Sequence, residues 1–308
     1  MINKFQQKYN EENKDRTLDP IRKPDMYKIK IPLGKNFADV HKQMREQGLN
    51  TVCEEARCPN KGECWSSRTA TFLIMGDICT RSCGFCNIKT GKPRTIDYDE
   101  PKRVAEVVKN LNLNHVVITS VDRDDLPDGG ASIFSETIKL IRQNLPSCTI
   151  EILIPDFKGL ESAFEIIMEY PPDILNHNLE TISRLYPYVR PQAKYERSLM
   201  LLDWFKKHNL ITKSGIMVGI GEEKEEVFEL MQDLRKVNCD IMTIGQYLQP
   251  SINHLRVHRY VSIDEFKEYE TYGKNLGFKD VFSGPFVRSS YHAEKHAELV
   301  PGHSSAKN

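Results

Sequence analysis

The chain has 308 residues, of which 39% are hydrophobic and 28% are charged, and its 43 basic and 43 acidic side chains give a formal net charge of zero. This balance argues against a nucleic-acid binder, which usually carries a basic surface stripe. No apolar run reaches the roughly 18 residues that a membrane-spanning helix needs. The polar start of the chain carries Glu11, Glu12 and Asp15, unlike a secretory signal or an acid-poor transit peptide. We therefore expect a cytoplasmic protein without a nucleic-acid or membrane partner.

Short apolar runs alternate with amphipathic stretches along most of the chain. Residues 1–35 are polar and proline-containing and predict an extended arm, and a short helix is expected near 37–47, ended by Gly48. The apolar runs predict strands at 71–77, 115–121, 149–155, 173–179, 213–219 and 240–247. The amphipathic stretches predict helices at 101–113, 131–145, 160–170, 196–210 and 223–237.

This alternation predicts a parallel sheet that is buried on both faces. Because the units repeat without an early dinucleotide-binding fingerprint, we expect an α/β fold, an incomplete (β/α)6 TIM-type barrel with N- and C-terminal extensions. The expected divisions are an N-terminal arm with a cysteine motif (1–66), the partial barrel (67–285) and a C-terminal extension (286–308). In such barrels the chemistry lies at the carboxyl ends of the strands.

Six of the eight cysteines lie between Cys53 and Cys86. Without a secretory signal, such clustering indicates metal chemistry before disulfides. The loop Cys79-x3-Cys83-x2-Cys86 follows the first predicted barrel strand. Three thiolates can hold three irons of a 4Fe–4S cluster and leave the fourth iron open to a chelating amino acid, such as the methionine part of S-adenosylmethionine. A zinc loop is the alternative, although zinc sites usually draw ligands from two separated pairs.

A second triplet, Cys53-x4-Cys58-x5-Cys64, precedes this loop. On a continuous helix, Cys58 would point away from the other two thiols, and Pro59 and Gly62 oppose a continuous helix. We expect the segment to fold back so that three thiolates converge on a second cluster. Three structural cysteines or a stray disulfide is the alternative.

The C-x3-C-x2-C loop resembles the signature of the radical S-adenosylmethionine superfamily, and the whole pattern resembles the lipoyl synthase family within it. CEEARCPNKGEC is similar to that family's auxiliary-cluster motif. The further matches, in order and spacing over residues 35–295, are DICTRSCGFCNIKTGKP, TSVDRDDLPDGGA, NHNLET, KSGIMVGIGE, QYLQP and GPFVRSSY. NHNLET alone is also similar to biotin synthase, which lacks the second triplet and the RSSY ending.

The resemblance implies two 4Fe–4S clusters and S-adenosylmethionine as cofactors. The implied ligands of the radical cluster are Cys79, Cys83 and Cys86. Those of the auxiliary cluster are Cys53, Cys58, Cys64 and Ser290. The implied reaction inserts two sulfur atoms at C6 and C8 of a protein-bound N6-octanoyl-lysine. A 5′-deoxyadenosyl radical would take the hydrogen atoms, and the auxiliary cluster would give up the sulfur.

Four more residues are candidate contacts of S-adenosylmethionine. Asn178 and Glu180 lie two apart on a predicted strand and so share a face, where they could bind the ribose or form a strand-end polar network. Asp122 lies in the acidic turn 122–125, which could instead be solvated. Arg190 could meet a carboxylate bidentately or form a surface ion pair.

The implied partners are an octanoylated lipoyl carrier domain (glycine-cleavage H protein or 2-oxoacid dehydrogenase acyltransferase), a low-potential electron donor (flavodoxin or ferredoxin) and an iron–sulfur carrier protein. Two other classes fit the motifs: a radical enzyme whose second cluster only transfers electrons, and a non-catalytic iron–sulfur electron carrier. Cys148 and Cys239 are predicted as small buried hydrophobes. The predicted surface or minor site residues are His254, His258, His292, His296 and His303.

Overall fold

The structure, a computed structural model, describes residue 24 and residues 35–56, 58, 60–66, 71–291, 293–296 and 299–300. The expected N-terminal arm lies outside this part of the chain, except for residue 24 and for residue 35, which begins a helix, and so do His292 and His303. Among the helices of the described residues, none combines the length and the apolar character that crossing a bilayer requires.

The six predicted strands form consecutive neighbours in one parallel sheet. They are β2 (Thr71–Ile74), β5 (His115–Ser120), β6 (Thr149–Leu153), β7 (Ile174–Asn176), β8 (Ile211–Val218) and β9 (Ile241–Gln246). The sheet extends beyond them at both edges. β10 (Asp280–Gly284) pairs in parallel with β9, and β1 (Asn50–Thr51) pairs antiparallel with β2. The expected incomplete barrel is therefore confirmed, and its sheet has 8 strands in the order β1-β2-β5-β6-β7-β8-β9-β10.

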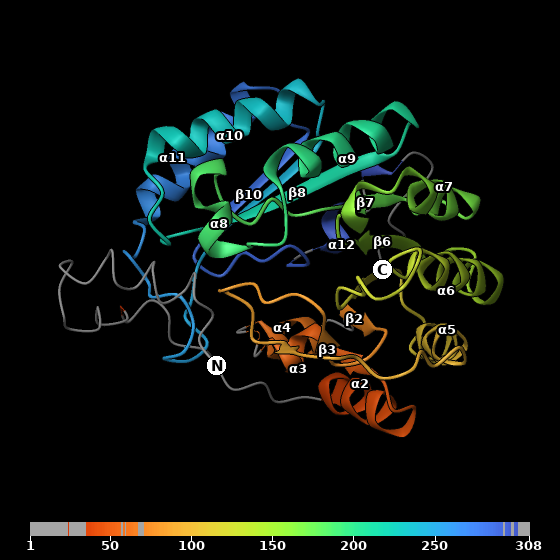
Figure 1. Cartoon of the computed structure of the whole chain (residues 1–308). Coiled ribbons are helices and arrows are strands. Elements are labelled where there is room, and N and C mark those ends of the chain that lie inside the picture. The colour runs from red at the N-terminus through yellow and green to blue at the C-terminus, as the bar shows by residue number, and fades with distance from the viewer. Residues whose placement is uncertain are drawn as a thin grey trace.

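Helices cover the outer face of this sheet (Figure 1). They are α5 (Glu100–Asn110), α6 (Ala131–Asn144), α7 (Glu161–Glu169), α9 (Tyr195–Lys207), α10 (Lys224–Lys236) and α11 (Ile263–Asn275). Five of them were predicted from the sequence. The sixth, α11, was missed together with β10, which follows it.

Local sequence explains how these helices begin and pack. α10 starts with a capping box, in which the side chains of Glu223 and Glu226 each bind the other's backbone N–H. Its buried residues recur at helical spacing: Val227, Leu230, Met231 and Leu234. Because one stripe of α10 is apolar, the helix can bury that stripe against the sheet while its charged face stays in water.

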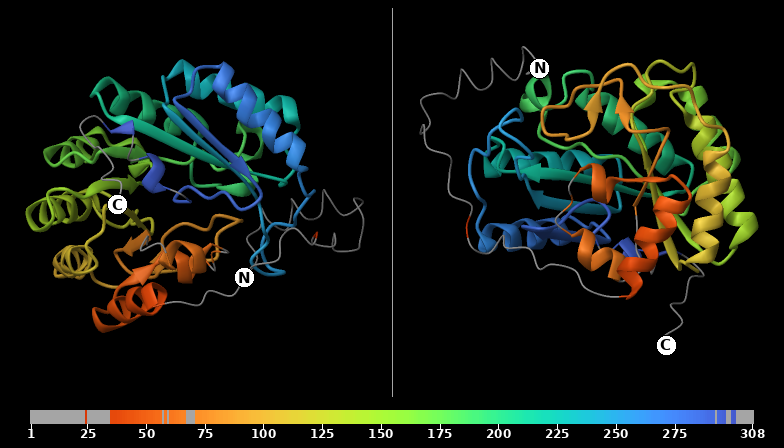
Figure 2. Two further views of the ribbon diagram at one scale, coloured as in Figure 1. Left: turned by 180° about the vertical axis from the view of Figure 1, so that it is seen from behind. Right: turned by 90° about the horizontal axis from the view of Figure 1, so that it is seen from below.

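The N-terminal elements pack beside β2 (Figure 2). They are α2 (Lys35–Glu46), α3 (Val52–Glu55) and α4 (Lys61–Ser66), and the buried Trp65 of α4 packs on Phe37 of α2 with ring centroids 5.1 Å apart. As predicted, α2 ends before Gly48, whose φ is +60°. The remaining short elements are β3 (Ile78–Cys79), β4 (Lys89–Thr90), α8 (Tyr186–Val189), α12 (Ala293–His296), and the 3-10 turns η2 (Phe157–Gly159) and η3 (Ser183–Leu185).

A buried carboxylate marks the point where the chain leaves β2 for the cysteine loop. Glu100 of α5 is 6% exposed and accepts a hydrogen bond of 2.7 Å from the backbone N–H of Met75. Met75 has a φ of +68°, a conformation that non-glycine residues rarely adopt. Burial raises the pKa of Glu100 to about 6.

We predict that Glu100 makes the stability of the fold depend on pH. The folded-state pKa exceeds the unfolded value, so proton binding favours the fold, and stability falls as the pH rises from 4.5 through about 6. The expected loss is about 2 kcal/mol. Urea unfolding on either side of this window should show the loss in the wild type and not in Glu100→Gln, whose amide oxygen can still accept from Met75. An equal loss in both proteins would contradict the prediction.

Candidate functional site

A cavity of about 500 Å³ lies at the carboxyl ends of the parallel strands. This volume is in the range that accommodates drug-sized ligands, roughly 300–1,000 Å³. Residues from both cysteine motifs and from the C-terminal segment line it: Cys53, Cys58, Cys79, Cys83, Cys86 and Ser290. Cys64, on α4, is partly buried against the hydrophobic core and does not line the cavity. One space therefore unites segments that are far apart in the sequence.

Backbone hydrogen bonds from neighbouring segments hold the loop that carries Cys79, Cys83 and Cys86. β3 and β4 pair and bring the two ends of the loop together. The N–H of Gly84 donates to Val189 O at 2.8 Å, and Gly84 O accepts from Leu255 N at 3.1 Å. Thr80 donates to Asp122 O through its backbone N–H and its hydroxyl, at 3.0 and 2.9 Å. The barrel therefore fixes the shape of this loop.

Arg81, inside the same loop, is a buried cation that the sequence analysis did not single out. Its guanidinium donates two hydrogen bonds of 2.8 Å to Asp124 and one of 2.7 Å to Asp156, and it lies 3.3 Å from Asp122. Burial alone would lower the pKa of Arg81, but hydrogen bonding to Asp124 and the charge of Asp122 raise it above its usual value. The sequence signal that could have identified Arg81 is its position between Cys79 and Cys83 of the loop.

Cys53, Cys79 and Cys86 form no disulfide, and their thiols are desolvated. Burial raises the pKa of Cys79 to about 11, that of Cys86 to about 12 and that of Cys53 to about 11. Iron binds the thiolate, so a cluster must replace these protons with its own positive charge. Buried soft donors on the wall of a cavity fit an iron–sulfur cluster. In the described part of the chain, no three His, Cys, Asp or Glu side chains gather around a position for a single metal ion.

Asn178, Glu180 and Arg190 form a connected polar group on the cavity wall. The side-chain N–H of Asn178 donates to Glu180 at 3.0 Å, and Arg190 donates to the backbone oxygen of Asn178 at 2.5 Å. Within the described residues, Oδ1 of Asn178 and Nε of Arg190 are buried without a hydrogen-bond partner. Buried polar atoms are rarely left unpaired, so these two indicate a polar ligand.

The sequence analysis expected Asn178 and Glu180 to share one face of a strand. In the structure the two residues are neighbours for a different reason. β7 ends at Asn176, and Glu180 has a φ of +65°, so the pair lies beyond the strand and is joined by its own hydrogen bond. Arg190 is buried and lies over the ring of Tyr186 at 5.4 Å, so the surface ion pair that was considered for it is not formed.

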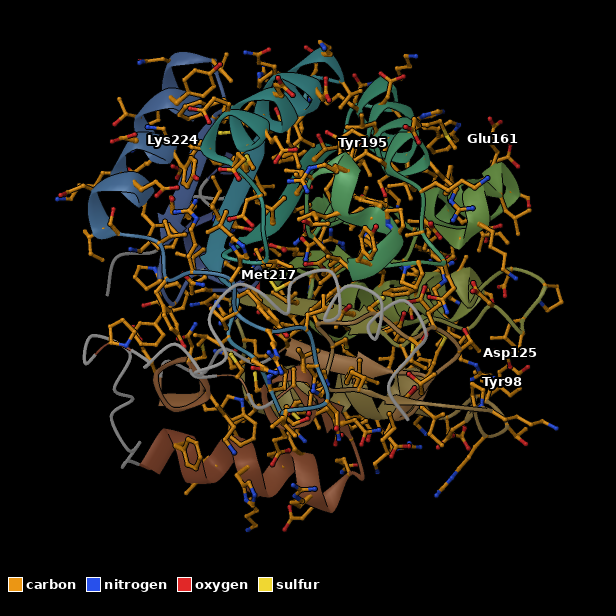
Figure 3. All side chains as sticks on the ribbon, turned by 60° about the vertical axis from the view of Figure 1, so that its left-hand side comes forward. Tyr98, Asp125, Glu161, Tyr195, Met217 and Lys224 are labelled. Atoms are coloured by element: carbon orange, nitrogen blue, oxygen red, sulfur yellow. The ribbon has the colours of Figure 1, made fainter. Side chains whose placement is uncertain are left out.

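The acidic turn 122–125 divides between the cavity and the surface. Asp122 lines the cavity, and its backbone N–H donates to Sγ of Cys79 at 3.3 Å. Asp125 instead pairs with Arg123 at 2.8 Å. In Figure 3, Asp125 lies at the edge of the molecule, whereas Met217, which lines the cavity, lies near the centre of the view. The turn therefore faces the cavity at Asp122 and the solvent at Asp125.

The C-terminal segment reaches the cavity beside the first cysteine motif. Asn60 donates a hydrogen bond of 2.7 Å to Phe286 O, and the hydroxyl of Tyr291 lies 3.3 Å from both carboxylate oxygens of Glu63. Ser289 and Ser290 both line the cavity, and the hydroxyl of Ser289 accepts from Asn178 at 2.5 Å. The sequence analysis singled out Ser290 and missed this contact.

Glycine at position 245 permits this docking. A Cβ atom on Gly245 would lie 2.0 Å from the backbone oxygen of Val287, so a larger residue would displace the segment.

A further contact joins the two cysteine motifs directly, because the side chain of Asn87 donates to Glu55 O at 2.8 Å. His254, predicted as a surface or minor site residue, lies 3.0 Å from Cys86 O.

Two family models match the sequence. The model described as the radical SAM superfamily matches residues 73–234, which form the barrel from β2 to α10. The model described as the N-terminal domain of lipoyl synthase of the radical SAM family matches residues 2–58. The two matches meet at the cavity, because Cys53 and Cys58 come from one and Cys79, Cys83 and Cys86 from the other.

Solved structures resemble the fold at low sequence identity. Streptococcus suis SuiB bound to its precursor peptide SuiA superimposes with a TM-score of 0.56 at 13% identity, over 91% of this chain and 61% of SuiB. HydG, a maturase of the [FeFe]-hydrogenase, superimposes with a TM-score of 0.54 at 12% identity, over 91% of this chain and 66% of HydG. These similarities support the partial-barrel fold alone.

Curated relatives are much closer in sequence. Lipoyl synthase of Rubrobacter xylanophilus is 53% identical over 90% of this chain and 87% of its own length. Lipoyl synthase of Caldanaerobacter subterraneus is 53% identical over 92% of this chain and 99% of its own length. The mitochondrial lipoyl synthase of Nematostella vectensis is 53% identical over 89% of this chain and 94% of its own length. The chain therefore belongs to the lipoyl synthase family, the sulfur-inserting enzymes of the radical SAM superfamily.

Proposed function

We propose that this enzyme inserts sulfur at C6 and C8 of a protein-bound N6-octanoyl-lysine and that an auxiliary 4Fe–4S cluster is the sulfur donor. The observation that carries the proposal is the single cavity lined by both cysteine motifs and by Ser290. A sulfur atom must come within bonding distance of the substrate carbon, so its donor has to face the substrate's own cavity. A cluster that only relays electrons has no such requirement.

In this proposal the two cysteine motifs hold separate clusters. The ligands of the radical cluster are Cys79, Cys83 and Cys86. The ligands of the auxiliary cluster are Cys53, Cys58, Cys64 and Ser290. When bound, the radical cluster and S-adenosylmethionine supply the 5′-deoxyadenosyl radical that takes a hydrogen atom from the octanoyl chain. The unpaired atoms of Asn178 and Arg190 support S-adenosylmethionine contacts at Asn178, Glu180, Asp122 and Arg190.

Apolar residues in the wall of the cavity support an acyl substrate. They are Leu73, Val121, Ile154, Met217 and Tyr247. Such a wall binds methylene groups and keeps water and other hydrogen donors away from a reactive radical. The chain's own contribution is therefore to orient the two clusters, S-adenosylmethionine and the substrate in a dry space.

The proposal includes partners and organisation. The substrate would arrive on an octanoylated lipoyl carrier domain, either the glycine-cleavage H protein or a 2-oxoacid dehydrogenase acyltransferase. Flavodoxin or ferredoxin would supply electrons, and an iron–sulfur carrier protein would rebuild the auxiliary cluster in the cytoplasm. Residues 1–66 and 286–308 would together complete the auxiliary site beside the barrel of residues 67–285.

The first prediction concerns iron content. Anaerobic reconstitution should give about eight irons and eight sulfides per chain, because each cysteine triplet suits a four-iron cluster. Replacing Cys79, Cys83 and Cys86 by Ala should remove roughly half of the iron and abolish S-adenosylmethionine cleavage. Iron analysis, visible absorbance and detection of 5′-deoxyadenosine measure these outcomes. Stoichiometric zinc without charge-transfer absorbance would rule the proposal out.

The second prediction separates a sulfur donor from an electron relay. The Cys53/Cys58/Cys64→Ala variant should still cleave S-adenosylmethionine, because the radical loop is unchanged, yet it should form no thiolated product. Mass spectrometry of an octanoyl-lysyl peptide after turnover measures both products. Formation of the dithiolated peptide by this variant would disprove the sacrificial role of the auxiliary cluster.

The third prediction compares two adjacent serines. A serine oxygen is a harder ligand than a thiolate and matches a soft iron–sulfur core less well, so its iron should leave first when sulfide is extracted. Ser290→Ala should lower product formation sharply while radical generation continues. Ser289→Ala is the matched control and should be milder, because it removes only the hydrogen bond from Asn178. Full sulfur insertion by Ser290→Ala with an unchanged auxiliary-cluster spectrum would remove Ser290 from the site.

A further inference from the structure

A buried ion pair lies on the inner face of the sheet. Lys213 of β8 and Glu151 of β6 are both 0% exposed, and the ammonium lies 2.8 and 3.0 Å from the two carboxylate oxygens. Asn176 of β7 donates a further hydrogen bond of 2.9 Å to Glu151. Charges in such a dry place are stable only when their hydrogen-bonding groups are matched, because desolvation is costly.

His296 of the C-terminal segment completes this cluster. Its ring is 0% exposed, its Nδ1 lies 2.9 Å from Nζ of Lys213, and it packs edge-on against Phe282 with centroids 4.5 Å apart. An ammonium has three N–H donors, and Glu151 with His296 provides three acceptors. Burial and the nearby Lys213 lower the pKa of His296, which keeps the ring neutral and able to accept. The prediction that His296 is a surface or minor site residue is therefore wrong.

The segment around His296 runs from one end of the barrel to the other. Ser289 and Ser290 line the cavity at the carboxyl ends of the strands. Leu299 and Val300 pack against Ile174, Ile211 and Ile241, the residues that begin β7, β8 and β9 at the opposite end. α12, which carries His296, lies between these two ends, inside the curve of the sheet (Figure 1).

We propose that His296 is a positioning residue, which anchors the C-terminal segment to Lys213 and Glu151 and so keeps Ser290 at the cavity whether or not an auxiliary cluster is bound. The inference rests on the proposed function for the role of Ser290 as a ligand. Asn60 holds Phe286, which precedes Ser290 in the chain, whereas His296 follows it. The segment is therefore anchored to the protein on both sides of Ser290. A segment held only by iron would become disordered when the cluster is consumed, and ordering it again would cost conformational entropy.

The experiment uses the full chain with Cys53, Cys58 and Cys64 replaced by Ala, so that no auxiliary cluster can hold the segment. Hydrogen–deuterium exchange should show residues 286–296 protected in this protein. Adding His296→Leu should speed exchange in these residues by at least about tenfold, the effect of losing a hydrogen bond to a charged group. Exchange in α10 should stay unchanged. His296→Asn should restore protection, because its amide oxygen, one bond from Cγ like Nδ1 of His296, can accept from Lys213.

The control is His208→Leu, the same change at an exposed histidine on the outside of the barrel, and it should leave exchange in residues 286–296 unaltered. If His296→Leu does not fold, His296→Ala replaces it, because alanine has no side-chain acceptor for Lys213 and adds no bulk. Unchanged exchange in residues 286–296 of the folded His296→Leu or His296→Ala variant would overturn the proposal, and so would loss of protection in the parent protein.

A second measurement separates this inference from the ligand role of Ser290. In protein with Cys79, Cys83 and Cys86 replaced by Ala, only the auxiliary cluster can form on reconstitution with iron and sulfide. After one-electron reduction, which makes this cluster paramagnetic, His296→Leu should alter its paramagnetic resonance spectrum in the same direction as Ser290→Ala, with His296→Asn close to the parent. If Ser290→Ala leaves the spectrum unchanged, the ligand role fails, while accelerated exchange in His296→Leu still supports the anchor.

Discussion

The ion pairs of Arg81 join the cysteine loop to the barrel, and the geometry of the site depends on them. Arg81 lies within the loop, and its carboxylate partners follow β5 (Asp122 and Asp124) and β6 (Asp156). Asp156 also binds Arg197 of α9, and although burial would raise the pKa of Asp156, the charge and hydrogen bond of Arg81 lower it to about 2. The loop can therefore shift only if buried charges lose their partners, which costs several kcal/mol.

The same cavity wall combines two kinds of surface. The thiols and the unpaired atoms of Asn178 and Arg190 suit charged or polar cofactors. Other lining residues, such as Leu73 and Ile154, suit a hydrocarbon chain. A barrel whose strands end at one rim can place both surfaces within one space, because neighbouring strands contribute different side chains there.

The sequence predicted what depends on local pattern and missed what depends on distant partners. Buried runs such as HVVITSV give strands because nearly every residue is apolar or small. β10, with the sequence DVFSG, was missed because only Val281 in it is fully buried, and α11 carries a sparse apolar stripe. The cysteine motifs are local and reach the cavity, apart from Cys64. The interior place of His296 depends on Lys213, 83 positions away, which no local pattern contains.

The hydrogen bond between Asn60 and Phe286 joins residues 226 positions apart, and this separation has a consequence for the biogenesis of the enzyme. During synthesis the barrel strands emerge from the ribosome before the segment that closes the first cysteine motif, and Gly245 of β9 must be in place before Val287 can dock against it. Contacts of such long range form late in folding. A nascent chain can thus present all its cysteines before the pocket around the first motif is closed. If that motif holds iron as in the proposed function, the iron is best delivered after release of the finished polypeptide.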